Sequence, residues 1–130
     1  MCIRDRDLIN RRADKGEMIS VNETDSLLVA YNRMRASDVS QIPVMNNNKL
    51  MGILDEEDLL FAVSKDQSSF SENVSDYMMD HLDTLQFDAS KDELLSILTE
   101  GKVAIIYDGE TFIGFVTKVD LINYYRNKIK

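Results

Sequence analysis

The sequence predicts a mixed α/β (α+β) fold made of two tandem repeats, each with the order strand, helix, strand, strand, helix. Two observations lead to this prediction. Two stretches of the chain resemble each other at a constant spacing, and within each stretch short apolar segments alternate with helix-period patterns. A chain of 130 residues can hold two such half-size repeats if they share a core. We therefore expect the repeats to pack about a pseudo-twofold axis, with strands inward and helices outward.

The repeat is clearest around two strands that contain glycine. Leu50-Met51-Gly52-Ile53-Leu54 in the first copy corresponds to Phe112-Ile113-Gly114-Phe115-Val116 in the second. Gly52 aligns with Gly114 and Asp58 with Asp120, at a constant offset of 62 residues. The same local structure is therefore expected twice, including the junction at which a strand passes into a helix.

Each repeat is expected to contain an amphipathic helix after its first strand. The first helix has apolar residues at helical spacing: Leu27, Leu28, Tyr31 and Met34. The second has Leu94, Leu95 and Leu98. Thr24 is the candidate N-cap of the first helix, and Ser90 with Glu93 has the spacing of a capping box in the second.

A hairpin and a second helix complete each repeat. Strands 42–45 and 50–54 are separated by an Asn-rich turn, and strands 103–107 and 112–116 by Asp108-Gly109. The predicted segments are an N-terminal helix or linker at 1–15, a first repeat at 16–65, a linker with a lead-in helix at 66–80, and a second repeat at 81–130. The opening MCIRDR is similar to an adapter-derived start of a truncated reading frame, so we expect the chain to be a fragment of a longer enzyme.

Composition excludes several classes of function. With 15 basic against 23 acidic residues, the net charge of −8 repels nucleic acid and anionic membrane surfaces. The sequence has neither an apolar run of about 20 residues, as a membrane span needs, nor a secretory signal at its start, so a cytoplasmic location is expected. The single cysteine, Cys2, cannot form an internal disulfide, and the single histidine, His81, leaves a zinc site or a histidine-based triad without its other members. We expect no catalytic residues and no metal site.

The repeat and its junctions resemble a known family. The apolar-Pro-Val strand at 42–44 and the Gly-apolar-apolar-Thr-x-x-Asp junction at 114–120 resemble a tandem pair of CBS domains, also called a Bateman module. More narrowly, residues 35–44, 52–60 and 112–124 are similar to the C-terminal regulatory region of bacterial cystathionine beta-synthase. In that family this region follows a pyridoxal-phosphate catalytic domain, for which the present chain offers neither a Schiff-base lysine in context nor a glycine-rich phosphate loop.

The resemblance implies a ligand cleft between the repeats and assigns residues to it. Thr117 and the first N–H groups of the following helix would meet a polar or anionic group, and Asp120 would accept both ribose hydroxyls. The adenine walls would be Phe115 and Val119, and the first repeat would contribute Val39 and Ser40. The alternative is that Thr117 is only a helix N-cap and Asp120 only a first-turn acid that complements the helix dipole.

The first copy departs from this pattern. Asp55 stands where the second copy has Thr117, which places an anion where a phosphate would approach. Asp58 keeps the ribose-binding position, although it is equally well explained as a helix-start acid. This site is expected to reject nucleoside phosphates, and it could be empty or serve only packing.

The resulting hypothesis is a regulatory module without intrinsic cofactor. It would sense an adenosine-type ligand, with S-adenosylmethionine favoured over AMP or ATP by the acidic charge, and it would allosterically control a pyridoxal-phosphate enzyme of the cystathionine beta-synthase type, in cis or in trans. A homodimer is expected. The alternative is a structural or dimerisation module with an unoccupied cleft, and an independent enzyme has little support.

Overall fold

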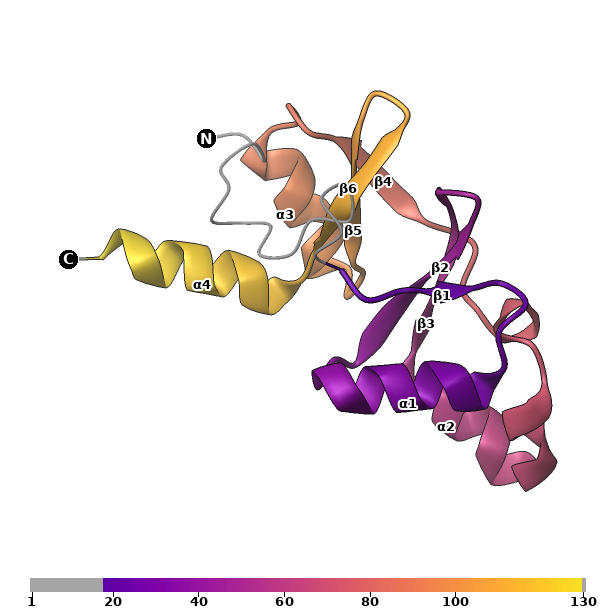
Figure 1. Cartoon of the computed structure of the whole chain (residues 1–130). Helices are drawn as coiled ribbons and strands as arrows, with labels where there is room; N and C mark the ends of the chain where they lie inside the picture. The colour runs from indigo at the N-terminus through magenta and orange to yellow at the C-terminus, as the bar shows by residue number, and fades with distance from the viewer. Residues whose placement is uncertain (1–17, 130) are drawn as a thin grey trace. The chain divides into compact units, whose positions relative to one another are not determined.

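The computed structural model describes residues 18–129, without the side chain of Lys128. These residues form two compact units, one comprising Ile19–His81 and the other beginning at Leu82. The first unit contains β1 (Val21–Asn22), α1 (Leu27–Ser37), β2 (Gln41–Asn46), β3 (Lys49–Asp55) and α2 (Glu56–Lys65) (Figure 1). The second contains β4 (Asp83–Gln86), α3 (Lys91–Thr99), β5 (Ala104–Asp108), β6 (Thr111–Val116) and α4 (Lys118–Lys128). The predicted fold of two strand-helix-strand-strand-helix repeats is confirmed. The N-terminal helix or linker expected at 1–15, which includes Cys2, lies outside the described residues.

Each repeat has its own three-stranded sheet of identical topology. In the first, β1 pairs parallel with β2 and β2 pairs antiparallel with β3; β4, β5 and β6 repeat this arrangement. Even the irregularity repeats: the register shifts after Val44 and again after Ile106, which leaves Met51 and Ile113 as extra residues in their strands. Such bulges redirect the side chains that follow them. The sequence repeat therefore extends to the local geometry that leads into each strand-helix junction.

The start of α1 differs from the prediction. Ser26, not Thr24, is the N-cap, because the Ser26 hydroxyl accepts the N–H of Val29 at 3.2 Å. Thr24 belongs to the preceding turn, where its hydroxyl and its N–H both donate to Asn22 Oδ1. At α3 the predicted capping box of Ser90 and Glu93 is confirmed.

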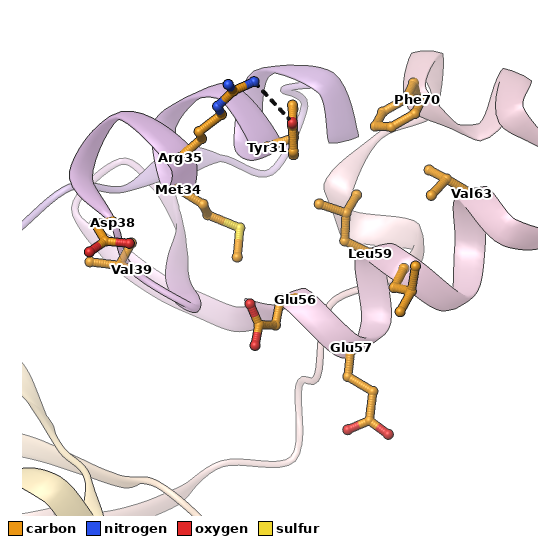
Figure 2. Close-up of a pocket in the computed structure, with 11 residues that line it drawn as sticks. Tyr31, Met34, Arg35, Asp38, Val39, Glu56, Glu57, Leu59, Val63 and Phe70 are labelled. Atoms are coloured by element: carbon orange, nitrogen blue, oxygen red, sulfur yellow. Dashed lines mark hydrogen bonds between the residues drawn. The ribbon is translucent and has the colours of Figure 1, made fainter.

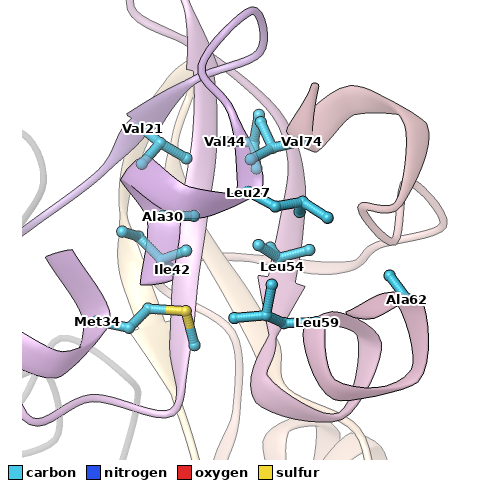
Figure 3. Close-up of a cluster of buried hydrophobic side chains, with 10 residues drawn as sticks. All are labelled: Val21, Leu27, Ala30, Met34, Ile42, Val44, Leu54, Leu59, Ala62 and Val74. Atoms are coloured by element: carbon cyan, nitrogen blue, oxygen red, sulfur yellow. The ribbon is translucent and has the colours of Figure 1, made fainter. Parts of the chain in front are cut away.

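Each repeat buries one apolar cluster between its helices and its sheet. The first cluster consists of Val21, Leu27, Ala30, Met34, Ile42, Val44, Leu54, Leu59, Ala62 and Val74 (Figure 3). The second consists of Leu94, Leu98, Ala104, Ile106, Ile113, Val116, Leu121 and Tyr124. Leu28 and Tyr31, which the helical spacing of α1 grouped with the buried face, are exposed instead, since Ala30 occupies the inward position.

The segment expected as a linker packs closely on the first repeat. It forms 3₁₀ helices at Gln67–Ser71 and Val74–Asp76, and the Val74 side chain is fully buried in the first cluster. Met79 then pairs with Ile53 of β3 through two backbone hydrogen bonds of 2.9 and 2.8 Å. Gly52 allows this approach, because a Cβ there would stand 2.7 Å from the Met79 carbonyl oxygen. The exact segment bounds stay predictions.

Within residues 18–129, no helix is long and apolar enough to cross a membrane.

Candidate ligand-binding site

The strand-helix junction of the second repeat brings together two of the predicted site residues. β6 ends at Val116, and Thr117 is the N-cap of α4. The Thr117 hydroxyl accepts the N–H of Asp120 at 3.4 Å and donates to Asp120 Oδ2 at 3.0 Å. The N–H of Thr117 also donates to Asp120 Oδ2, at 2.8 Å. Hydroxyl and carboxylate are thus held in a fixed relation at the first turn of the helix.

This junction has the groups that a polar ligand requires. The first turn of a helix presents N–H groups that the helix itself cannot satisfy, here those of Lys118 and Val119 after the cap. They lie at the positive end of the α4 dipole, which favours an anionic or strongly polar ligand group. The Asp120 carboxylate, with two acceptor oxygens, suits the paired hydroxyls of a ribose. The same contacts also form a complete helix cap, so the structure is compatible with both predicted roles.

Phe115 lies two residues before this junction in an aromatic group on the second sheet. The bulge at Ile113 puts Phe115 on the same side of the sheet as Phe112 and Tyr107. Their ring centroids lie 6.3 Å (Phe112–Phe115) and 6.0 Å (Tyr107–Phe112) apart. Burial raises the pKa of the Tyr107 hydroxyl, as expected in an apolar setting. Val119, the other predicted adenine wall, is 61% exposed on α4.

The first-repeat junction has the same shape with different charges. Asp55 is the N-cap of α2, and its Oδ1 accepts the N–H of Asp58 at 2.8 Å. The Asp58 Oδ2 atom is buried and has no hydrogen-bond partner among residues 18–129. Burial, followed by the nearby Asp55 carboxylate, raises the pKa of Asp58. Replacing the threonine cap by an aspartate therefore makes this junction a carboxyl pair with an unsatisfied oxygen.

Val39 and Ser40 lie beside the junction of their own repeat. The Ser40 carbonyl accepts the N–H of Glu56 at 2.9 Å, which ties the chain before β2 to the start of α2. The N–H of Val39 donates to the Met34 carbonyl at 3.0 Å and closes the end of α1. Ser40 is thus placed next to the start of α2, and Val39 at the end of α1. Their predicted contribution to a site with Thr117 and Asp120 stays a prediction.

A groove between α1 and α2 was not predicted from the sequence. It has a volume of about 620 Å³ and is shown in Figure 2. Its lining residues are Tyr31, Met34, Arg35, Asp38, Val39, Glu56, Glu57, Leu59, Leu60, Val63 and Phe70. The Tyr31 and Phe70 rings meet edge to face at 6.0 Å along one wall. The sequence signal that could have indicated this groove is that α1 and α2 have more apolar residues than one buried face of each helix needs.

No metal site is formed in the part of the chain that the structure describes. No cluster of three or more His, Cys, Asp or Glu side chains with metal-binding geometry occurs there. His81 is exposed at the boundary of the two units, as predicted for a surface loop residue.

Solved structures of low sequence identity share the fold. CBSX2 in complex with AMP aligns with a TM-score of 0.83 at 16% identity, covering 99% of this chain and 98% of that one. A CBS domain-containing protein from Bacillus anthracis aligns with a TM-score of 0.81 at 18% identity, covering 99% and 95%. The CBS-domain containing protein ATU1752 from Agrobacterium tumefaciens aligns with a TM-score of 0.78 at 20% identity, covering 96% and 99%. No curated protein matches the sequence.

The family follows from the sequence match. The CBS domain model matches residues 3–65 and 74–127, which include both repeats and both strand-helix junctions. CBS domains are regulatory ligand-binding modules rather than catalytic domains. With its two repeats of matching topology, capped junctions and bulges, the chain belongs to the CBS domain family as a tandem pair, a Bateman module.

Proposed function

We propose that this Bateman module binds an adenosine-type ligand at the junction of Thr117 and Asp120. The observation that carries the proposal is the fixed pairing of a hydroxyl and a carboxylate at the first turn of α4, at 2.8 to 3.4 Å. The ribose hydroxyls donate to the Asp120 carboxylate, and the first N–H groups of α4 receive the polar group attached to the ribose. The adenine packs against Phe115 and Val119. The AMP bound to CBSX2, a protein of the same fold, supports this class of ligand.

Charge favours a ligand with a positive centre. The net charge of −8 disfavours polyanions such as ATP near the surface. In the first repeat, the Asp55 carboxylate occupies the cap position and would repel a phosphate, whereas a sulfonium or ammonium group would be attracted. S-adenosylmethionine is therefore our preferred ligand over AMP and ATP. The unsatisfied Asp58 Oδ2 makes the first junction a second, phosphate-rejecting candidate site.

Ligand binding would act on a catalytic domain. A ligand that binds one arrangement of the module better than another shifts the equilibrium between them, and a domain attached in cis or bound in trans then experiences that shift. We propose a pyridoxal-phosphate enzyme of the cystathionine beta-synthase type as that domain, since residues 35–44, 52–60 and 112–124 resemble its regulatory region. The module would act as a homodimer, in the cytoplasm where such an enzyme and its adenosine-type effector would meet.

A thermal-shift titration with S-adenosylmethionine, AMP and ATP tests the ligand proposal. A ligand that binds only the folded chain increases the free energy of unfolding, by about 2.7 kcal/mol when the ligand concentration is one hundred times Kd. The melting temperature rises as a result. We expect the largest shift with S-adenosylmethionine and its loss in Asp120→Ala. Glu93→Ala is the matched control, because Glu93 occupies the same capping-box position on α3 but lies outside the proposed site. It should lower the melting temperature to a similar degree and keep the ligand response.

The outcomes separate the proposals. A larger shift with AMP would overturn the preference for S-adenosylmethionine and keep the site. An equal response in Asp120→Ala would overturn the site. No shift with any ligand would favour the second candidate, a structural dimerisation module, which the exposed apolar groove between α1 and α2 also supports.

A further inference from the structure

Two consecutive methionines fasten the segment after α2 to the outer edge of β3. The N–H of Met79 donates to the Ile53 carbonyl at 2.8 Å, and the N–H of Ile53 donates to the Met79 carbonyl at 2.9 Å. Residues 78 and 79 are called here the methionine strap. The pairing with β3 is an isolated bridge rather than a ladder, so the strap depends on the packing of its side chains as well.

The Met78 side chain provides that packing. It is partly buried against the first apolar cluster, and its Sδ and Cγ atoms lie over Gly52, where an added Cβ would stand 2.8 and 2.9 Å from them. The thioether thus fills the space that a side chain at position 52 would need. The Met79 side chain differs, because it is 51% exposed. Met78 is therefore the sulfur on which the closed position of the strap depends.

A partly exposed thioether in such a place is sensitive to peroxide. A lone pair of the sulfur attacks one oxygen of hydrogen peroxide, the O–O bond breaks, and after proton transfer the products are a sulfoxide and water. The sulfur is oxidised by two electrons and the peroxide is reduced by two. The sulfoxide is larger by one oxygen and polar, and the closely packed apolar space over Gly52 accommodates neither property.

We propose that Met78 is an oxidation site through which peroxide releases the methionine strap from β3. The oxidised side chain turns out to solvent, its contacts with Gly52 and the first cluster are lost, and the Ile53–Met79 hydrogen bonds open more often. Reduction of the sulfoxide to the thioether restores the packing. The strap thus makes the first repeat responsive to peroxide, and this response does not depend on the proposed ligand site.

Amide hydrogen exchange of the full chain, before and after treatment with hydrogen peroxide, tests the proposal. Peptide mass spectrometry locates the sulfoxides. Displacing a half-buried methionine should weaken the protection of the Ile53 and Met79 amides by about fivefold, whereas the amides that join β2 and β3 keep theirs. Treatment with a methionine sulfoxide reductase should restore the original protection.

Two leucine substitutions distinguish the two sulfurs of the strap. Met78→Leu conserves volume without a sulfur, so the variant should stay folded and lose the response to peroxide. Met79→Leu is the matched control, because it removes the neighbouring, more exposed sulfur and should keep the response. Met78→Gln places a polar group over Gly52 and should weaken the protection of the same two amides without peroxide.

Three results would overturn the proposal. The first is a chain that forms no sulfoxide at Met78 until it unfolds, as expected of the fully packed Met34. The second is unchanged protection of the Ile53 and Met79 amides once Met78 is oxidised. The third is a response to peroxide that survives Met78→Leu or disappears in Met79→Leu. Circular dichroism of each variant establishes that it is folded before treatment.

Discussion

Replacing Gly52 by alanine should destabilise the first repeat through crowding. A Cβ at this position would stand 2.7 Å from the Met79 carbonyl oxygen and 2.8 and 2.9 Å from the Met78 Sδ and Cγ atoms. The Met78 side chain can move aside, but the Met79 carbonyl is held by its hydrogen bond from the N–H of Ile53. Relief therefore requires the 78–79 segment to shift away from β3 and weaken both Ile53–Met79 hydrogen bonds.

The expected magnitude combines two contributions. Forcing a methyl group into a packed site costs roughly 1–3 kcal/mol, and each weakened backbone hydrogen bond costs up to about 1 kcal/mol. We expect Gly52→Ala to lose roughly 2–4 kcal/mol, and a unit of this size changes its melting temperature by about 4–8 °C per kcal/mol. Urea and thermal unfolding, followed by circular dichroism, measure the loss.

Gly109→Ala is the control for the cost of replacing a glycine. Gly109 has a φ of 63°, and a Cβ added there would meet no atom within 4 Å, so its substitution costs only the left-handed backbone conformation, about 1 kcal/mol. The double variant Gly52→Ala/Met78→Ala should recover only part of the stability that Gly52→Ala loses, because the Met79 carbonyl remains in place. If Gly52→Ala destabilised the chain no more than Gly109→Ala, the crowding argument would be refuted.

Further predictions concern charge and capping. The raised pKa of Asp58 contributes stability that is present at low pH and lost as pH rises through the folded-state pKa. Asp58→Asn should therefore stabilise the chain at neutral pH, by no more than a few tenths of a kcal/mol because solvent screens the two carboxylates, and it should reduce the pH dependence of the urea midpoint; lower stability than the wild type at pH 7 would contradict this. Ser26→Ala should lower the free energy of unfolding by about 1 kcal/mol and Thr24→Ala by clearly less, since only Ser26 caps α1. Equal losses in urea unfolding would contradict the assignment of Ser26 as the cap. Lys102 pairs with Asp83 and Glu100 at 3.5 and 3.3 Å on the exposed surface, so Lys102→Ala should leave the unfolding midpoint unchanged within error, and a clear shift would show a structural role.

Several features of the site could be predicted from the sequence because they are local. Thr117 and Asp120 lie three positions apart at a helix start, and that spacing alone brings a cap hydroxyl and a carboxylate together. The same holds for Ser90 and Glu93. The departure at Asp55 was also visible, and the structure adds its physical consequence, an unsatisfied oxygen on Asp58 and a raised pKa.

Other predictions failed or remained incomplete because they depend on packing. Thr24 and Ser26 are both acceptable caps by residue type, and the choice depends on where the turn that precedes α1 ends. Leu28 and Tyr31 recur at the same helical spacing as the buried residues of α1. They are nevertheless exposed, because Ala30 occupies the inward position against the sheet. Helical spacing defines a broad apolar side and does not say which edge of it is buried.

The sequence by itself determined the tandem repeat, the order of its strands and helices, and the polar residues at each junction, since these follow from periodicity and short-range hydrogen bonding. Only the tertiary structure decided that the 66–80 segment packs on the first repeat, that Gly52 is required by the backbone of Met79, and that α1 and α2 leave an open apolar groove. Each of these depends on contacts between residues far apart in the chain, whose distances no local pattern records.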